Sequence, residues 1–430
     1  MNYYKRTADA LLQDLLDAFG AVLIEGPKWC GKTTTASQLA NSILRMQDPS
    51  MREEYLATAK TKPSILLNGA TPRLIDEWQD APMLWDAVRT TVDDRQIPGQ
   101  FILTGSNAVD KSQIHHSGAG RIARLRMLPM SLWESQESTG EVSLKELFNN
   151  PDYDIDGKMS KMTVEDLIFA ASRGGWPASL LARTPKAQLL VAKNYVQTIC
   201  SDDVSGIDGK KRDAKLTSMI LRAYARNVST LVKKKSLLDD VTSSGEVSCH
   251  VDTFDDYVSA LEKLFVIQNI SAWCPAIRSK TAIRSSVKRC FCDPSIPIAL
   301  LGLSPESLSM QLRTFGFIFE QMCIRDLKAY TIDLNSHVSY YHDRYDLEAD
   351  IVLHLEDGRY ALIECKLGSS EIDEGAKHLL ELKRLIQEHN KTEKQVPIRE
   401  PDLLIVMTGG TMAYSRPDGV KVIPLACLKD

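Results

Sequence analysis

One short stretch constrains this chain more than any other: Gly26-Pro27-Lys28-Trp29-Cys30-Gly31-Lys32-Thr33, with the spacing G-x-x-x-x-G-K-T. It follows the apolar run 21–24 and leads, from Thr34, into a helical pattern over 34–40. Glycines let the backbone curl so that its N–H groups point at phosphate oxygens, and Lys32 reaches the β- and γ-phosphates. The Thr33 hydroxyl is suited to Mg²⁺. We therefore expect residues 26–34 to bind the phosphates of a nucleotide.

A second motif supplies what hydrolysis needs. After a candidate second strand at 64–67, residues 73–77 form an apolar segment that ends in Asp76-Glu77. In a P-loop protein an acidic strand end lies opposite the phosphate loop, where Asp76 holds Mg²⁺ through water and Glu77 polarises the attacking water. The pair predicts ATP as the nucleotide, Mg²⁺ as its cofactor and hydrolysis as the reaction.

Two further segments favour the same site. Residues 100–107 read as a strand ending in Ser106-Asn107, and parallel strands gather their carboxyl ends at the ligand edge. Asn107 or Ser106 is therefore a candidate sensor of the γ-phosphate, and the alternative is a plain turn. Residues 118–126 carry three arginines, and Arg121 is the candidate to stabilise transition-state charge, in its own subunit or in a neighbouring one.

The segments GPKWCGKTT, LIDEWQDAP, FILTGSNA and GRIARLRMLPMSLWE, in this order, resemble prokaryotic AAA-type ATPases that carry a C-terminal domain of unknown function. The resemblance implies an AAA-like α/β nucleotide-binding domain. It also implies a later Gly-Gly-aromatic-Pro element, present as Gly174-Gly175-Trp176-Pro177, and an aromatic-x-Asp element, present at 291–293. It implies no particular substrate.

Composition narrows the class of protein. The 430 residues are 43% apolar and 25% charged with a net charge of −4, which is typical of a globular protein of two to four domains. That balance gives no global affinity for nucleic acid, so a basic surface has to be local. Apolar runs are too short to span a bilayer, the N-terminus lacks a signal-peptide pattern, and the nine cysteines include no C-x-x-C pair. We expect a cytoplasmic protein without a zinc site or a membrane segment.

The middle of the chain predicts helices. Residues 141–205 read as a helical connector interrupted by a polar loop at 149–161, and residues 215–270 read as three helices and a strand, a winged-helix pattern that the resemblance also implies. The third helix is acidic, so we expect it to serve structure or protein contacts rather than DNA. The segment 277–292 carries Arg278, Lys280, Arg284, Lys288 and Arg289 without an acid. It is the candidate for contact with nucleic acid or with the rest of a complex, and the alternative is a solvated basic hairpin.

The C-terminal region reads as a helix (314–330), three strands near 338–341, 350–355 and 360–366, a helix (371–388) and a strand (403–407). That order is the core of restriction-endonuclease-like folds. Asp350, Glu364 and Lys366 resemble the D…(D/E)-x-K motif of that group, and Glu320 lies where those proteins often place a helical acid. The alternative is a hairpin with ion-paired surface residues.

The turn between two of these strands decides whether the carboxylates meet. A two-residue loop at Asp357-Gly358 sets Asp350 opposite Cys365. A three-residue loop at 356–358, with Gly358 at positive φ, pairs Leu355 with Arg359 and sets Asp350 opposite Glu364. We predict the three-residue loop.

These observations predict an α/β chain with a parallel P-loop sheet, a mainly helical winged-helix domain and a restriction-endonuclease-like domain. The expected boundaries are 1–140 for the P-loop ATPase domain, 141–205 for the helical connector, 206–300 for the winged-helix domain and 301–430 for the restriction-endonuclease-like domain. The expected function is an Mg²⁺-dependent ATPase or ATP-driven switch that acts on the C-terminal modules. Alternatives are an ATP-regulated metal-dependent nuclease, with DNA at 278–289 or at the C-terminal domain, and a nucleotide-binding regulator without turnover. A homo-oligomer is compatible with either role of Arg121.

Overall fold

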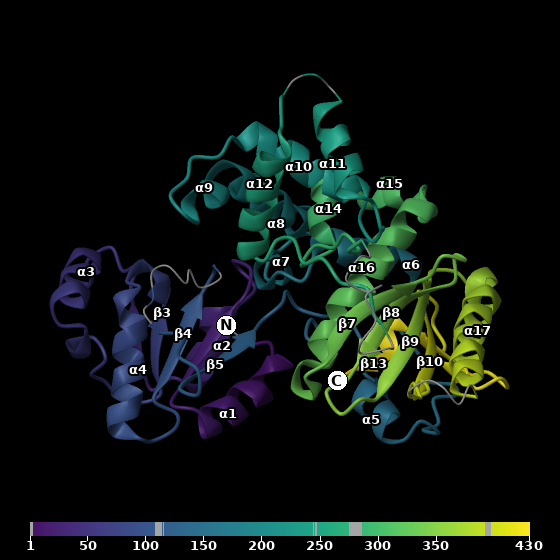
Figure 1. The fold of residues 1–430 in the computed structure, drawn as a ribbon, viewed down its shortest axis with the longest axis horizontal. Coiled ribbons are helices and arrows are strands. Elements are labelled where there is room, and N and C mark those ends of the chain that lie inside the picture. Colours follow the sequence, from purple (N-terminus) through teal and green to yellow (C-terminus); the bar gives the residue numbers. More distant parts are fainter. Residues whose placement is uncertain are drawn as a thin grey trace. The chain divides into compact units, whose positions relative to one another are not determined.

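The computed structural model describes residues 3–107, 114, 116–243, 245, 247–274, 286–391 and 397–430 (Figure 1). The chain divides into two compact units. The first comprises Met1–Pro129 with Lys263–Phe265, and the second comprises Met130–Glu262 with Val266–Asp430.

A five-stranded parallel sheet forms the centre of the first unit, in the order β2-β3-β4-β1-β5. Its strands are β1 (Ala21–Glu25), β2 (Ser42–Arg45), β3 (Arg73–Asp76), β4 (Phe101–Gly105) and β5 (Ile122–Arg126). Because the strands are parallel, the residues that follow β1, β3 and β4 meet at one edge. The P-loop, Asp76-Glu77 and Ser106-Asn107 all occupy that edge, as the sequence predicted.

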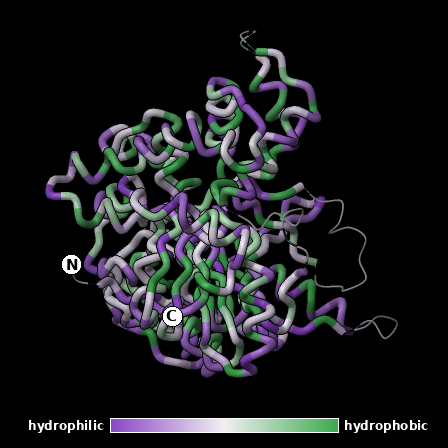
Figure 2. Tube along the Cα trace, turned by 90° about the vertical axis from the view of Figure 1, so that its left-hand side faces the viewer, coloured by the Kyte–Doolittle hydropathy of each residue, from purple (hydrophilic) through white to green (hydrophobic). Residues whose placement is uncertain are grey.

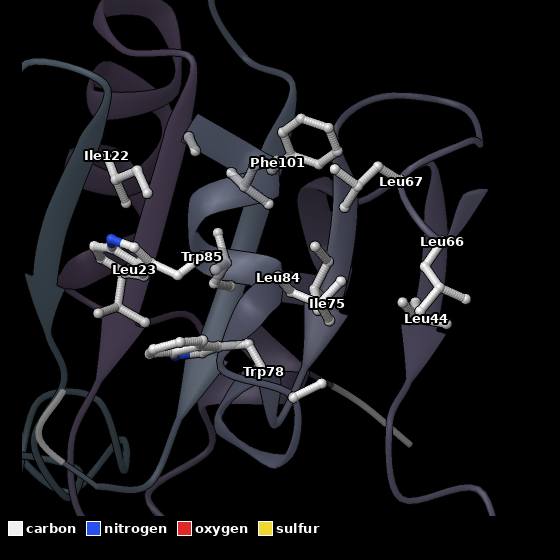
Figure 3. Packing of buried hydrophobic residues seen from close by; sticks show 14 of the residues in the cluster. Leu23, Leu44, Leu66, Leu67, Ile75, Trp78, Leu84, Trp85, Phe101 and Ile122 are labelled. Atoms are coloured by element: carbon white, nitrogen blue, oxygen red, sulfur yellow. The ribbon is translucent and has the colours of Figure 1, made fainter. Parts of the chain in front are cut away.

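Helices and a tightly packed apolar core surround this sheet. They are α1 (Ala8–Ala18), α2 (Lys32–Leu39), α3 (Arg52–Thr61), α4 (Met83–Arg95) and the 3₁₀ turns η1 (Pro63–Ile65) and η2 (Trp78–Asp80). Figure 3 shows Trp78, Trp85 and Phe101 packing with aliphatic side chains of the strands. This core holds the strands, and therefore the loops at their ends, in register.

One strand prediction in this unit is wrong. We expected the apolar string 64–67 to be the second strand, but it contains η1, and Leu66 and Leu67 pack into the core without joining the sheet. Pro63 stands at the first position of η1, where its fixed φ suits a helical turn and its missing N–H costs nothing. The actual strand is β2, a short edge strand with little apolar signal.

Helices make up most of the second unit between residues 144 and 309. They are α5 (Leu144–Asn149), α6 (Val164–Arg173), α7 (Pro177–Leu180), α8 (Pro185–Thr198), the π-turn η3 (Ile199–Asp203), α9 (Val204–Gly206), α10 (Ala214–Arg226), α11 (Lys234–Thr242), α12 (Val251–Lys263), α14 (Ser295–Leu301) and α15 (Pro305–Ser309). The loop predicted at 149–161 separates α5 from α6.

The Gly-Gly-Trp-Pro element and the Asp293 element contact each other. The Gly175 N–H donates to Asp293 Oδ2 at 2.9 Å, and the buried Trp176 indole donates to Ser295 Oγ at 3.0 Å. Gly174 has φ +78, which favours glycine. Two motifs over a hundred residues apart therefore form one structural joint.

Three helices, α10, α11 and α12, occupy the positions of the predicted winged helix. The strand expected at 265–270 is reduced to isolated antiparallel bridges, Ile267 with Phe291 and Ile270 with Lys288. Residues 275–285 lie outside the described residues. The winged-helix assignment remains a prediction.

A six-stranded mixed sheet forms the C-terminal part, in the order β11-β12-β10-β9-β8-β7. Its elements in chain order are α16 (Leu312–Tyr330), the 3₁₀ turn η4 (Ile332–Leu334), β7 (His337–His342), β8 (Glu348–His354), β9 (Tyr360–Lys366), the 3₁₀ turn η5 (Ser369–Glu371), α17 (Ile372–Asn390), β10 (Leu403–Thr408), β11 (Tyr414–Ser415) and β12 (Lys421–Pro424). After the 3₁₀ turn η6 (Leu425–Cys427), a small second sheet pairs β13 (Leu428–Lys429) with β6 (Val142–Ser143). The predicted order of helix, three strands, helix and strand is present.

The hairpin register also agrees with the prediction. The Leu355 N–H donates to the Arg359 carbonyl at 2.8 Å, Gly358 has φ +87, and Ile351 pairs with Ile363. Continuing that register by one residue sets Asp350 opposite Glu364. The three-residue loop is therefore confirmed.

Hydrophobic residues occur in short stretches along the trace, separated by hydrophilic ones (Figure 2). Among the helices described, none has the length and apolar character needed to cross a membrane.

Candidate functional site: a phosphate loop and its carboxylates

The phosphate loop joins the end of β1 to the start of α2. Gly26 and Gly31 have φ +154 and +102, values that favour glycine. A Cβ atom on Gly26 would lie 2.2 Å from the carbonyl oxygen of Met127, because the backbone after β5 runs directly against the loop. Glycine at 26 is thus a steric requirement of the site.

Lys32 is buried and turned into the loop, as the phosphate-binding prediction requires. Its Nζ donates to the carbonyl of Gly26 at 3.0 Å and to that of Pro27 at 2.8 Å. The ammonium therefore lies within the curl of the backbone, where a bound phosphate would be its stronger acceptor. The remaining predicted loop residues differ in exposure: Cys30 is buried, Lys28 is half-buried, and Trp29 and Thr34 are exposed.

Thr33 and Asp76 meet as the metal prediction requires. The Thr33 hydroxyl donates to Asp76 Oδ1 at 2.6 Å, and the Thr104 hydroxyl donates to the same oxygen at 2.7 Å. A hydroxyl beside a carboxylate at the end of a phosphate loop is an oxygen donor set that suits Mg²⁺ bound together with nucleotide phosphates. The residues present therefore fit the ion.

Glu77 follows directly, in a left-handed backbone conformation with φ +55 and ψ +50. Its N–H donates to Thr104 Oγ1 at 3.2 Å, and its carboxylate accepts a bond from Ser106 Oγ at 3.3 Å and one from the Gln79 amide. Thr104 thus connects Asp76 to Glu77. No motif in the sequence points to Thr104; the available signal is a polar residue near the end of a buried strand.

Asn107 is the last residue described before the gap at 108–113. Its Oδ1 is buried, and within the described part of the chain no donor reaches it. Its neighbour Ser106 is already engaged by Glu77 and Gln79. Of the two candidates, Asn107 therefore keeps a side-chain acceptor, which suits a hydrogen of a bound water; contact with a γ-phosphate oxygen would use its amide N–H as the donor.

Arg121 lies at the wrong edge of the sheet to act on its own P-loop. Its carbonyl accepts a bond from the Ala21 N–H at the start of β1, and its Nε donates to Asp93 at 2.8 Å. The length of β1, about 16 Å at roughly 3.3 Å per residue, separates it from Gly26. The expectation of a role within its own subunit is therefore wrong, and a role across an interface between copies stays a prediction.

Arg126 is the arginine that lies at the same edge of the sheet as the P-loop. It ends β5 beside Glu25, with 3.8 Å between Arg126 Nη2 and Glu25 Oε1, and Arg124 also approaches Glu25, at 3.6 Å. The Arg126 side chain is 58% exposed. Spacing alone did not show which of the three arginines reaches this edge.

Arg6 is a second residue that the sequence did not reveal. Its guanidinium is buried and donates to the carbonyl of Cys30 at 2.7 Å and to that of Leu128 at 2.7 Å. It thus ties the loop to the segment after β5. A basic residue before the first helix carries no motif that would predict this contact.

In the C-terminal sheet, Glu364 and Lys366 share one face, with 2.9 Å between Nζ and Oε2. Asp350 Oδ2 accepts a bond from the Cys365 N–H at 2.8 Å. Burial, followed by the charge of Asp350, raises the pKa of Glu364 to about 8. The structure brings the three predicted residues together.

Two of the five basic residues proposed for DNA contact face inward, which contradicts that role for them. Lys288 contacts Glu320 and Asp350, and Arg289 donates to Tyr224 and to the carbonyl of Val232. Both are less than one-tenth exposed. Arg278, Lys280 and Arg284 lie outside the described residues.

The acidic third helix, α12, uses its charges in ion pairs. Asp255 pairs with Lys234 at 2.9 Å, and Asp256 pairs with Lys210 and Arg212 at 2.8 and 2.9 Å. These contacts agree with a structural role for this helix.

Three segments of the chain match known protein families, and most of its length is similar to known proteins. Residues 18–136 match the family described as AAA domain, residues 164–307 match Domain of unknown function (DUF8612), and residues 315–428 match Domain of unknown function (DUF4143). The chain is 24% identical over 366 residues to the uncharacterized proteins Mb2031c of Mycobacterium bovis and Rv2008c of Mycobacterium tuberculosis, covering 83% of this chain and 72% of each relative. A Walker-type ATPase of Pyrococcus abyssi matches with a TM-score of 0.42 and 12% identity, over 70% of this chain and 96% of that one.

The chain therefore carries an AAA-type P-loop domain followed by a C-terminal domain of unknown function, as the resemblance implied.

Proposed function

We propose that this protein is an Mg²⁺-dependent ATPase whose nucleotide cycle acts as a switch on its C-terminal modules. One observation carries the proposal: hydrogen bonds run without interruption from Thr33 through Asp76 and Thr104 to the backbone of Glu77. The metal ligand and the general base are thus held by one network, so a metal-bound nucleotide and its attacking water would be positioned together.

Each residue then has a defined part. The loop backbone and Lys32 hold the phosphates, and Thr33 and Asp76 hold Mg²⁺, which neutralises the phosphate oxygens when bound. Glu77 accepts a proton from the attacking water, while Ser106 and Gln79 orient its carboxylate. Asn107 Oδ1, which no donor reaches within the described residues, accepts the other hydrogen of that water.

Two variants test the proposal. Lys32→Ala removes the cation that neutralises the phosphates, so we expect ATP binding to be lost in an equilibrium assay. Glu77→Gln keeps the shape but loses the base, so binding persists while phosphate release falls by roughly 10²–10⁴-fold. Lys60→Met, on the exposed surface of α3, is the matched control. A Glu77→Gln protein with the wild-type turnover rate would refute the role of Glu77.

The same assay separates the regulator without turnover. That alternative requires tight ATP binding and a wild-type rate of phosphate release no greater than that of Glu77→Gln. Measurable turnover that depends on Glu77 contradicts it.

The nuclease alternative is favoured by the hairpin register, which places Asp350 opposite Glu364 beside Lys366. Its test is cleavage of plasmid and linear DNA with Mg²⁺ or Mn²⁺, which Asp350→Ala would abolish. The contacts of Lys288 with Glu320 and Asp350 favour the absence of cleavage by the wild-type protein.

A further inference from the structure

A cluster of carboxylates is formed by three elements of the C-terminal part: the buried Glu320 on α16, the largely buried Asp350 on β8 and the buried Glu364 on β9. Burial raises the pKa of Glu320, the Lys288 ammonium lowers it, and the negative charge of Asp350 raises it again; burial and Asp350 also raise the pKa of Glu364. Buried like charges are costly unless cations compensate them. The question is which cation this cluster holds.

Lys288, which lies outside the sheet, supplies a cation to this cluster. Its side chain is 7% exposed, and its Nζ contacts Glu320 Oε1, the carbonyl oxygen of Asp350 at 2.9 Å and Asp350 Oδ1 at 3.8 Å. Burial lowers the pKa of this ammonium, but the carboxylates of Glu320 and Asp350 outweigh burial and raise it. The lysine is therefore charged and sits between two carboxylates.

We propose that the Lys288 ammonium takes the cation position of this cluster, so that Glu320 and Asp350 form an internal ion-pair lock on the segment 288–295 instead of a divalent-metal centre. The proposal concerns the C-terminal part alone and does not depend on ATP hydrolysis.

The oxygens of Asp350 are already committed in this arrangement. Oδ2 accepts the Cys365 N–H, Oδ1 faces Lys288, and the backbone carbonyl accepts the ammonium. Mg²⁺ demands near-octahedral oxygen coordination at about 2.1 Å, and an adjacent ammonium repels it. Across the described ranges, moreover, no group of three or more His, Cys, Asp and Glu side chains is arranged to hold a metal ion.

The backbone around Lys288 holds it in this position. Lys288 and Ile270 exchange both backbone hydrogen bonds, at 2.9 and 3.1 Å. On α16, the side chain after Glu320 continues the attachment, because Gln321 accepts from the Phe291 N–H at 2.9 Å and donates to its carbonyl at 2.8 Å. Further along, Arg325 pairs with Asp293 at 3.1 Å.

The next residue extends the lock to the helices. Arg289 donates to the Tyr224 hydroxyl on α10 and to the Val232 carbonyl, each at 3.2 Å. Two successive buried cations therefore fasten one segment to two neighbours, Lys288 to the sheet and α16, and Arg289 to the α10 region.

The first test is a Mn²⁺ titration of the full-length wild-type chain by calorimetry, without nucleotide. We expect no stoichiometric Mn²⁺ binding that depends on Asp350. A saturable site of one Mn²⁺ per chain that Asp350→Asn removes would overturn the proposal.

The second test removes the lysine. Lys288→Met leaves carboxylates uncompensated, so the thermal midpoint should fall by roughly 6–20 °C. Lys288→Met with Glu320→Gln removes both partners and should recover at least half of that loss. Lys377→Met, at an exposed lysine of α17, should leave the midpoint unchanged.

Either of two results contradicts the lock: a Lys288→Met protein as stable as the wild type, or a double variant no more stable than the single one. If Lys288→Met yields no folded protein, recovery of folded protein in the double variant supports the proposal and its failure overturns it.

Discussion

The contact between Arg6 and the phosphate loop allows a quantitative prediction. Arg6 is buried, and its two guanidinium bonds, each 2.7 Å long, hold Cys30 within the loop and Leu128 after β5. We consider Arg6→Met, which replaces the aliphatic part of the arginine side chain with one of similar size and removes both hydrogen-bond donors.

The expected magnitude follows from the bonds lost. A hydrogen bond to a charged group contributes about 1.5–3 kcal/mol, so losing both costs the first unit about 3–6 kcal/mol of stability. Only the bond to Cys30 acts on the loop itself. If its full value orders the loop for phosphate, ATP binding weakens by about 10- to 100-fold, since 1.4 kcal/mol is a factor of ten.

Two measurements check this: the anisotropy of a fluorescent ATP analogue and the thermal midpoint. Arg6→Lys, which keeps a charge but not the fork of two donors, should fall between Arg6→Met and the wild type. Lys60→Met is the surface control. An Arg6→Met protein that binds ATP within twofold of the wild type, with the same midpoint, would refute the reasoning.

Two further predictions concern a glycine and a carboxylate. Gly26→Ala places Cβ 2.2 Å from a backbone oxygen, so both the thermal midpoint and the affinity for ATP should fall sharply. The control Gly120→Ala, at φ +75 with open space around the new Cβ, should cost only about 1 kcal/mol of backbone strain. Equal effects of the two substitutions would contradict the steric argument. Glu364 has a folded-state pKa of about 8, above its usual value near 4.5, so its contribution to stability is full below pH 4.5 and is lost as the pH rises to 8. Thermal midpoints between pH 5 and pH 8 should therefore fall less steeply in Glu364→Gln than in the wild type, and parallel curves would show that Glu364 ionises normally.

Short-range rules predicted much of this protein. The spacing of the glycines located the phosphate loop. The polar residues that end two apolar strands placed Asp76, Glu77 and Asn107 at the same edge of the sheet as that loop. A single turn type gave the pairing that sets Asp350 opposite Glu364. These features depend on φ preferences and side-chain alternation over a few residues, which the order of amino acids states directly.

The failures have a common cause. The string 64–67 has strand composition but follows a proline, and its leucines are buried without pairing. The basic segment around Lys288 has the composition of a surface, yet two of its charges are buried. Composition states what a residue prefers, while burial depends on which distant partner is present.

Local order along the chain was therefore enough to predict the phosphate loop, the two carboxylates at its edge of the sheet and the hairpin register, because each is set within a few residues of backbone. Only the tertiary structure decided that Arg121 lies at the far edge from its own loop, that Arg6 holds that loop, and that Lys288 fills a carboxylate cluster. Those three outcomes depend on long-range packing, in which a charged side chain is placed by elements far from it in sequence.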